Sequence, residues 1–87
     1  MVRLIEEIRA EFHIPPYFSD EGLTSYIEEG KAVLDFINPG RDYDTDKTYR
    51  MLLKNYVYYA YHNIVNEWEK NYARIILTWQ MGSEVLQ

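Results

Sequence analysis

Residues 46–81 read DKTYRMLLKNYVYYAYHNIVNEWEKNYARIILTWQM and contain neither proline nor glycine. Apolar residues recur through this segment at spacings of three and four, which is the period of an amphipathic α-helix. The sequence therefore predicts one helix of roughly 35 residues, from Asp46 to about Met81. At about 1.5 Å per residue this helix would be about 52 Å long, whereas a compact globule of this chain length is roughly 30 Å across. Part of the helix is expected to extend beyond the chain's own core.

The apolar residues of this segment fall on two faces. The inner face belongs to the first half and comprises Tyr49, Leu53, Tyr56, Val57, Ala60 and Ile64. The outer face belongs to the second half, is rotated by about 100° on the helical wheel, and comprises Tyr61, Val65, Trp68, Tyr72, Ile75, Ile76 and Trp79. We expect the inner face to pack against the rest of the chain and the outer face to form a subunit interface, because a large exposed aromatic patch usually marks an interaction site. The alternative is that the other helices pack on different sides of the long helix, which would make both faces internal.

Two shorter helices are predicted before this segment. The first has an apolar face of Leu4, Ile5, Ile8 and Phe12, and it ends at the two prolines of residues 15–16, which cannot continue a helix. The second begins after the N-cap Ser19, ends at the Asn-Pro-Gly of residues 38–40, and has an apolar face of Leu23, Tyr26, Ile27, Leu34 and Ile37. Asp44 or Thr45 is the expected N-cap of the long helix. Residues 1–87 are thus predicted to form a single all-α domain, a small helical bundle with two short helices packed on one long C-terminal helix.

Composition narrows the function classes. The chain has 14 acidic and 9 basic residues and a formal net charge of −5, which argues against a surface that binds nucleic acid by neutralising many phosphates. It has no cysteine, so disulfides and thiolate metal ligands are excluded. The N-terminal residues lack the uninterrupted apolar stretch of a signal peptide, and no segment approaches the roughly 18 apolar residues of a membrane span. We expect a soluble, unprocessed protein.

Catalytic and metal-binding patterns are not found. His13 and His62 have no second histidine or suitably spaced glutamate nearby, so no metal site is expected. Asp42, Asp44 and Asp46 alternate as calcium ligands do, but the glycine and the later glutamate of a calcium loop are missing. The sequence has no nucleophile elbow and no glycine-rich phosphate loop. We therefore expect no enzymatic activity, no catalytic residues and no cofactor.

One basic stripe is notable. Lys47, Arg50 and Lys54 are spaced by three and four residues near a predicted helix N-terminus, where positive charge is mildly unfavourable. The stripe could contact an acidic neighbour or a phosphate backbone. Asp46 lies four residues before Arg50 and is its expected local partner.

Five segments occur in an order that is typical of a known helical family. They are YFSDEGL (17–23), YIEEGK (26–31), the Asp-Tyr-Asp loop (42–44), YRMLLKNY (49–56) and WEKNY (68–72). Together they span most of the chain, and they resemble the small head-tail connector (adaptor) proteins of tailed bacteriophages. The sequence departs from that family at Tyr72, since connectors of this type often carry arginine directly after the asparagine that is Asn71 here.

The resemblance implies a structural virion protein at the head-tail junction, assembled in the host cytoplasm. It would form a homo-oligomeric ring, expected to be twelvefold, below the portal, where it completes the head and allows tail attachment. Its partners would be other copies of itself, the portal protein and a neighbouring head-tail or tail completion protein. Genome DNA would pass through the channel without sequence-specific binding, which the acidic balance suits. Such a ring joins one surface of a subunit to a different surface of the next, as the inner and outer faces would allow.

Two other functions compete with this prediction. One is a small helical interaction or regulatory adaptor that dimerises through its long aromatic helix. The other is a DNA-binding or DNA-packaging helical domain, which the net negative charge disfavours.

Overall fold

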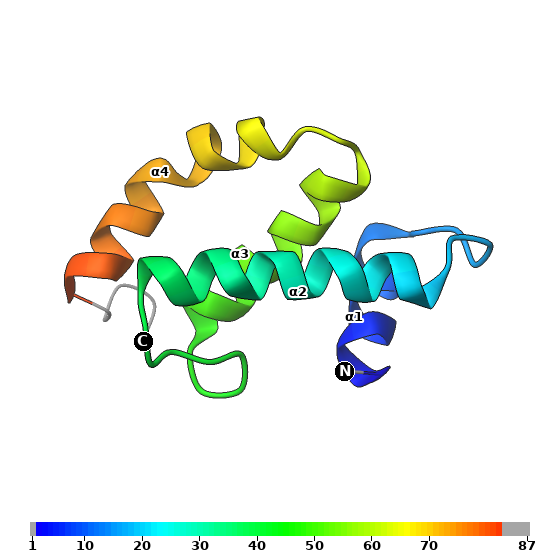
Figure 1. The fold of residues 1–87 in the computed structure, drawn as a ribbon, viewed down its shortest axis with the longest axis horizontal. Helices are drawn as coiled ribbons and strands as arrows, with labels where there is room; N and C mark the ends of the chain where they lie inside the picture. Colours follow the sequence, from blue (N-terminus) through cyan, green and yellow to red (C-terminus); the bar gives the residue numbers. More distant parts are fainter. Residues whose placement is uncertain (1, 83–87) are drawn as a thin grey trace.

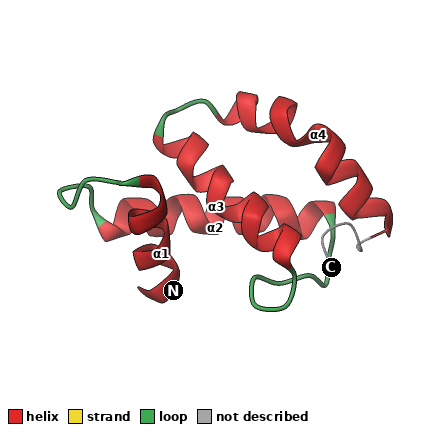
Figure 2. Cartoon of the chain, turned by 180° about the vertical axis from the view of Figure 1, so that it is seen from behind, coloured by secondary structure: helices red, strands yellow, loops and turns green. Residues whose placement is uncertain are grey.

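The computed structural model describes residues 2–82, and these form four α-helices (Figures 1 and 2). They are α1 (Val2–Phe12), α2 (Asp20–Ile37), α3 (Lys47–Tyr61) and α4 (Val65–Gly82). The predicted all-α class and the two N-terminal helices are confirmed. The prediction of one long C-terminal helix is wrong, because the segment is divided at residues 62–64 and α4 turns back over the molecule.

The central pair of the fold is α2 and α3, which pack across each other (Figure 1). Helix α1 lies near the N-terminal end of α2, and α4 arches over α3 towards the C-terminal end of α2. The chain measures 39 × 25 × 20 Å along its principal axes. The expected overhang of a helix about 52 Å long is therefore absent.

The corner between α3 and α4 needs neither proline nor glycine. Asn63 takes a left-handed conformation with φ of 60°. Its N–H donates to the carbonyl of Ala60 at 2.9 Å, and the N–H of Ile64 donates to the carbonyl of Tyr59 at 2.9 Å. This pair of bonds is the Schellman pattern, which satisfies the last carbonyls of a helix, and asparagine is the commonest residue after glycine at its left-handed position. The helix therefore stops at a place that the periodicity of its apolar residues does not mark.

A single hydrophobic core joins all four helices. The inner face is buried as predicted except for Ile64, which lies in the corner and is 40% exposed. Folding α4 back adds Trp68 and Trp79 to this core, with exposures of 1% and 0%. A straight helix would have left both tryptophans outside the chain's own core, and the burial of two large aromatic side chains is the physical reason for the corner.

The connections are held by side chains that bond to the backbone. Arg9 of α1 donates to the carbonyls of Pro15 and Phe18 at 3.0 and 2.5 Å and pairs with Asp20 at 2.7 Å, which fixes the loop between α1 and α2. Ser19 accepts from the N–H of Gly22 at 3.0 Å, so the predicted N-cap of α2 is confirmed.

The N-cap of α3 is Asp46, one position beyond the predicted candidates Asp44 and Thr45. Its Oδ1 accepts the N–H groups of Thr48 and Tyr49 at 2.9 and 3.0 Å. Its Oδ2 accepts the indole N–H of Trp79 at 2.9 Å, which links the start of α3 to α4. The predicted pairing of Asp46 with Arg50 is wrong, because both carboxylate oxygens are directed to these donors and to Arg41, whose Nε lies 3.8 Å from Oδ2.

Gly30 lies on the face of α2 that packs against α3. A Cβ atom at this position would come within 2.8 Å of Leu53 Cδ1 and 2.9 Å of Tyr56 Cδ1, both of which belong to buried side chains. The glycine costs about 1 kcal/mol of helix propensity relative to alanine. The close helix crossing explains why it is present in the middle of α2.

We predict that Asp46→Ala lowers the free energy of unfolding by about 2–4 kcal/mol, because it removes a helix cap and the bond from the buried indole N–H of Trp79 to Oδ2. Asp46→Asn should lower the free energy of unfolding by about half as much, since its single side-chain oxygen can still cap the helix. Urea denaturation followed by tryptophan fluorescence measures both. The control is Asp44→Ala, at an exposed carboxylate for which the described residues provide no side-chain partner. Equal stability of Asp46→Ala and Asp44→Ala would contradict the prediction.

We also predict that Gly30→Ala destabilises the protein by about 1–2 kcal/mol, since the overpacking of Leu53 and Tyr56 outweighs the gain in helix propensity. Gly82→Ala is the matched control, because a Cβ there meets no atom of residues 2–82 within 4 Å. Thermal denaturation followed by circular dichroism compares the two variants. A Gly30→Ala protein as stable as Gly82→Ala would show that α2 and α3 can separate at no cost.

Candidate interaction surfaces

The tryptophans of the predicted outer face contact the chain's own helices. The indole N–H of Trp68 donates to the carbonyl of Leu52 at 3.2 Å, and its ring packs edge-on against Tyr56 with centroids 5.1 Å apart. Trp79 is bonded to Asp46 and packs edge-on against Tyr49. Both tryptophans are buried within the chain, with exposures of 1% and 0%. Their assignment to a surface facing away from the chain is therefore wrong.

The remaining outer-face residues are half-buried and pack against the edge of the core. These are Tyr61, Val65, Tyr72, Ile75 and Ile76. Tyr72 packs edge-on against Tyr59, whose hydroxyl accepts from Asn71 Nδ2 at 3.0 Å. Their role in a subunit interface stays a prediction for the parts of these side chains that solvent can reach.

Among the side chains that the structure describes, five large apolar ones are exposed, and sequence reasoning placed none of them in the interface. They are Tyr17 (87%), Phe36 (87%), Ile64 (40%), Leu77 (56%) and Met81 (79%). Their positions follow from the elements that carry them. Tyr17 lies in the loop before α2 and Phe36 in the last turn of α2, so they flank a helix of 18 residues that runs along the long axis (Figure 1). Tyr17 and Phe36 therefore lie near opposite ends of the molecule.

Leu77 and Met81 belong to the same end as Phe36. Asn38 follows α2 directly, and its Nδ2 donates to the carbonyl of Trp79 at 3.2 Å, which places the end of α4 beside the end of α2. The sequence does contain a signal for these exposed positions, namely an apolar residue that lies outside the periodic apolar face of its helix. Phe36 interrupts a polar side of α2, and Leu77 and Met81 lie one turn apart among polar residues of α4.

The basic stripe is largely occupied by the fold. Lys54 pairs with Glu11 of α1 at 2.8 Å. Arg50 donates from Nε and Nη2 to the carbonyls of Tyr43 and Asp44 at 3.2 and 3.1 Å, and its guanidinium stacks 4.9 Å from the centroid of the Tyr43 ring. Of the three, only Lys47 is exposed, whereas Arg50 and Lys54 are half-buried. The structure therefore divides these three residues among different roles.

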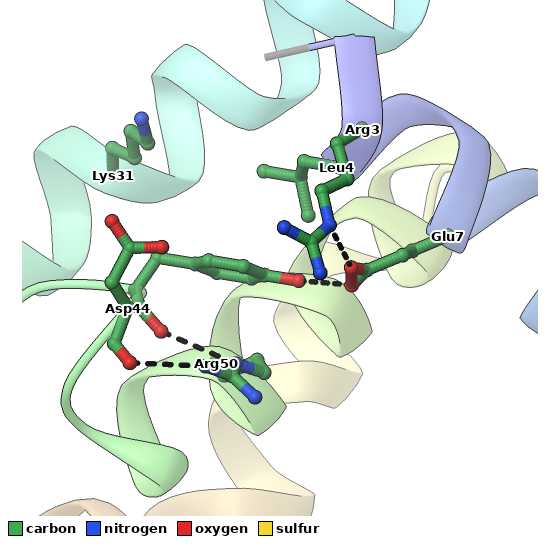
Figure 3. A pocket seen from close by; sticks show the side chains of 7 residues that line it. Arg3, Leu4, Glu7, Lys31, Asp44 and Arg50 are labelled. Carbon is green, nitrogen blue, oxygen red and sulfur yellow. Dashed lines mark hydrogen bonds and ion pairs between the residues drawn. The ribbon is translucent and has the colours of Figure 1, made fainter.

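A polar pocket of about 320 Å³ lies between α1, α2 and the loop before α3 (Figure 3). The hydroxyl of Tyr43 donates to Glu7, which also lies 4.0 Å from Arg3 Nε. The pocket contains three cationic and two anionic side chains, so it has no strong preference for a charged ligand. The bond from Tyr43 to Glu7 in this pocket holds the 38–46 loop against α1. It is lined by Arg3, Leu4, Glu7, Lys31, Tyr43, Asp44 and Arg50.

Several tyrosine hydroxyls reach from the core to a carboxylate at the surface. Tyr49 donates to Asp35 at 3.1 Å and Tyr56 to Glu29 at 2.5 Å. Burial raises the pKa of Tyr43 and of Tyr49 to about 12, and the nearby carboxylate is the second cause of this shift. Burial and the bond to Glu29 raise the pKa of Tyr56 as well, and burial beside Tyr59 raises the pKa of Tyr72. The phenols thus tie the helices together in their protonated form.

Within residues 2–82 no three or more His, Asp or Glu side chains are grouped so that they could hold a metal ion. Every helix of this described part is too short or too polar to cross a membrane.

Comparisons of the chain with protein-family models, with curated proteins and with solved structures found no match.

We predict that the free energy of unfolding falls as the pH rises from about 10 to about 12. In this window the tyrosines of the unfolded chain lose their protons while the folded state retains them on Tyr43 and Tyr49, so the unfolded state binds fewer protons. Below about pH 10 this contribution to stability is fully present. Tyr49→Phe should reduce the decline by up to about 1.4 kcal/mol per pH unit.

Urea denaturation at a series of pH values measures this slope. Tyr17→Phe is the control, because it removes the hydroxyl of a tyrosine that is 87% exposed. The same slope in Tyr49→Phe and in the unmodified protein would rule out the linkage.

Proposed function

We propose that the chain is a structural, non-catalytic subunit of a homo-oligomeric ring at the head-tail junction of a tailed bacteriophage. The ring would lie below the portal, complete the head and allow DNA passage and tail attachment. The resemblance of five sequence segments to small head-tail connectors motivates the phage assignment. The observation in the fold that best supports a ring is the exposure of large apolar side chains at both ends of the long axis.

The two ends carry different groups. One end, here called the loop end, presents Tyr17. The other, here called the helix end, presents Phe36, Leu77 and Met81 at the adjoining ends of α2 and α4. Surfaces that differ in this way favour a heterologous contact, in which the loop end of one subunit meets the helix end of the next. Repeated contacts of this kind close into a ring when the rotation between subunits allows it.

The charge of the chain fits a channel for DNA. The net charge of −5 limits adhesion to the phosphate backbone, and Arg50 and Lys54 are already paired within the chain. A virion location and an assembly in the host cytoplasm belong to the same proposal.

We predict self-association that increases with protein concentration, and closed rings in electron micrographs of the protein alone or mixed with a portal protein. Sedimentation velocity gives the mass of the assembly. A stable monomer at high micromolar concentration that also ignores portal protein would refute the proposal. A two-fold dimer would favour the helical adaptor instead.

The head-to-tail contact has a sharper test. Tyr17→Glu should disable the loop end and Phe36→Glu the helix end, so each variant alone should be monomeric. Mixing the two should restore one intact contact and give a heterodimer, since the loop end of one variant meets the helix end of the other. Asn66→Glu adds the same charge at an exposed polar site in the first turn of α4, away from Phe36, Leu77 and Met81, and should leave assembly unchanged. A heterologous interface would be contradicted if either variant still dimerised by itself and if the mixture formed no additional heterodimer.

A further inference from the structure

The corner at residues 62–64 is a marginal break in a segment that is otherwise suited to one helix. From Asp46 to Met81 the chain has no proline or glycine. The corner depends on Asn63 in the left-handed conformation, at φ of 60°. Asparagine adopts this conformation at a higher cost than glycine, and all three corner residues can also continue a helix.

The corner contributes little packing of its own. His62 and Asn63 are exposed, and Ile64 is 40% exposed. The ring of His62 contacts Tyr58 and Tyr61, which belong to α3 and would remain its neighbours in a longer helix. The backbone bonds from Asn63 and Ile64 to α3 would be replaced by ordinary helical bonds. Straightening the corner therefore sacrifices few contacts.

The contacts that hold α4 lie elsewhere. Trp68 donates to Leu52 of α3, Trp79 donates to the α3 cap Asp46, and Asn38 donates back to α4. Each of these groups is equally present in a second copy of the chain. A single chain with a straight corner would expose both tryptophans, so opening is favourable only when another copy receives α4.

We propose that α4 is exchanged between copies of this chain. In the exchanged form residues 62–64 become helical, α3 and α4 form one continuous helix, and the α4 of each copy packs on the α2 and α3 of another. The outer-face tryptophans then do form a subunit contact, by the same bonds that they make within one chain in the folded monomer. Exchange between identical segments is a low-cost route to oligomers. It does not depend on the phage role, which requires only the contact between the loop end and the helix end.

Paired spin labels distinguish the two forms directly. The chain has no cysteine, so Lys47→Cys and Gln80→Cys, both at exposed positions, provide the only labelling sites. In the closed form the labels are close together, because Asp46 and Trp79 next to them are bonded at 2.9 Å. In a continuous helix they are about 50 Å apart at about 1.5 Å per residue. Diluting the labelled protein in an excess of unlabelled protein before it is concentrated ensures that each measured distance lies within one chain.

Two substitutions at the corner shift the balance in opposite directions. Asn63→Ala disfavours the left-handed corner and favours the helix, so it should increase the population with the long distance about tenfold per chain. Asn63→Gly favours the corner and should reduce that population by a similar factor. We expect the short distance at low concentration. At high concentration we expect a population with the long distance, and this population should be largest in Asn63→Ala.

Two results would overturn the exchange. Oligomers that contain only the short distance, in all three proteins, would show that subunits associate with the corner closed, and the ring proposal would stand without exchange. A monomer with only the short distance at every concentration would overturn both. Circular dichroism confirms in each case that the variants are folded.

Discussion

The bond between the buried carboxylate of Asp46 and the indole of Trp79 is the constraint on which the rest of the structure depends. Asp46 is 3% exposed and uses one oxygen to cap α3 and the other to hold α4. A buried charge is stable only when donors surround it, and here two backbone N–H groups, an indole N–H and the nearby Arg41 provide them. The start of α3 and the last turns of α4 are thereby brought together, which requires the chain to reverse between them.

This reversal redistributes the apolar surface. Trp68 and Trp79 complete the core over α3. Of the exposed large apolar side chains of the described residues, Ile64 lies in the corner and the others lie near the ends of the long axis. The end-to-end contacts of the proposed ring would use these side chains. The exchange that we propose changes mainly the backbone of three residues, and it would bury the tryptophans between two chains instead of within one.

The abundance of tyrosine and of acidic residues has a common structural use. Tyr43, Tyr49 and Tyr56 place their rings in or beside the core and donate their hydroxyls to Glu7, Asp35 and Glu29 at its rim. An amphipathic ring of this kind allows a small core to end in hydrogen bonds rather than in exposed hydrocarbon. These acidic side chains therefore help to hold the helices together, which the net charge of the chain does not reveal.

Local signals in the sequence determined the all-α class, the presence of the first two helices, the cap at Ser19 and the buried inner face apart from Ile64, because periodicity, proline and capping act over a few neighbouring residues. Gly30 was also visible as an exception within α2, although only the crossing with α3 explains it. Tertiary structure alone decided the corner at Asn63, the choice of Asp46 as the cap and the burial of the two tryptophans. Asparagine is compatible with both a helix and a left-handed turn, so the sequence around residue 63 does not distinguish them. The surface formed by α2 and α3, distant in sequence from α4, makes the turn favourable by accepting Trp68 and Trp79.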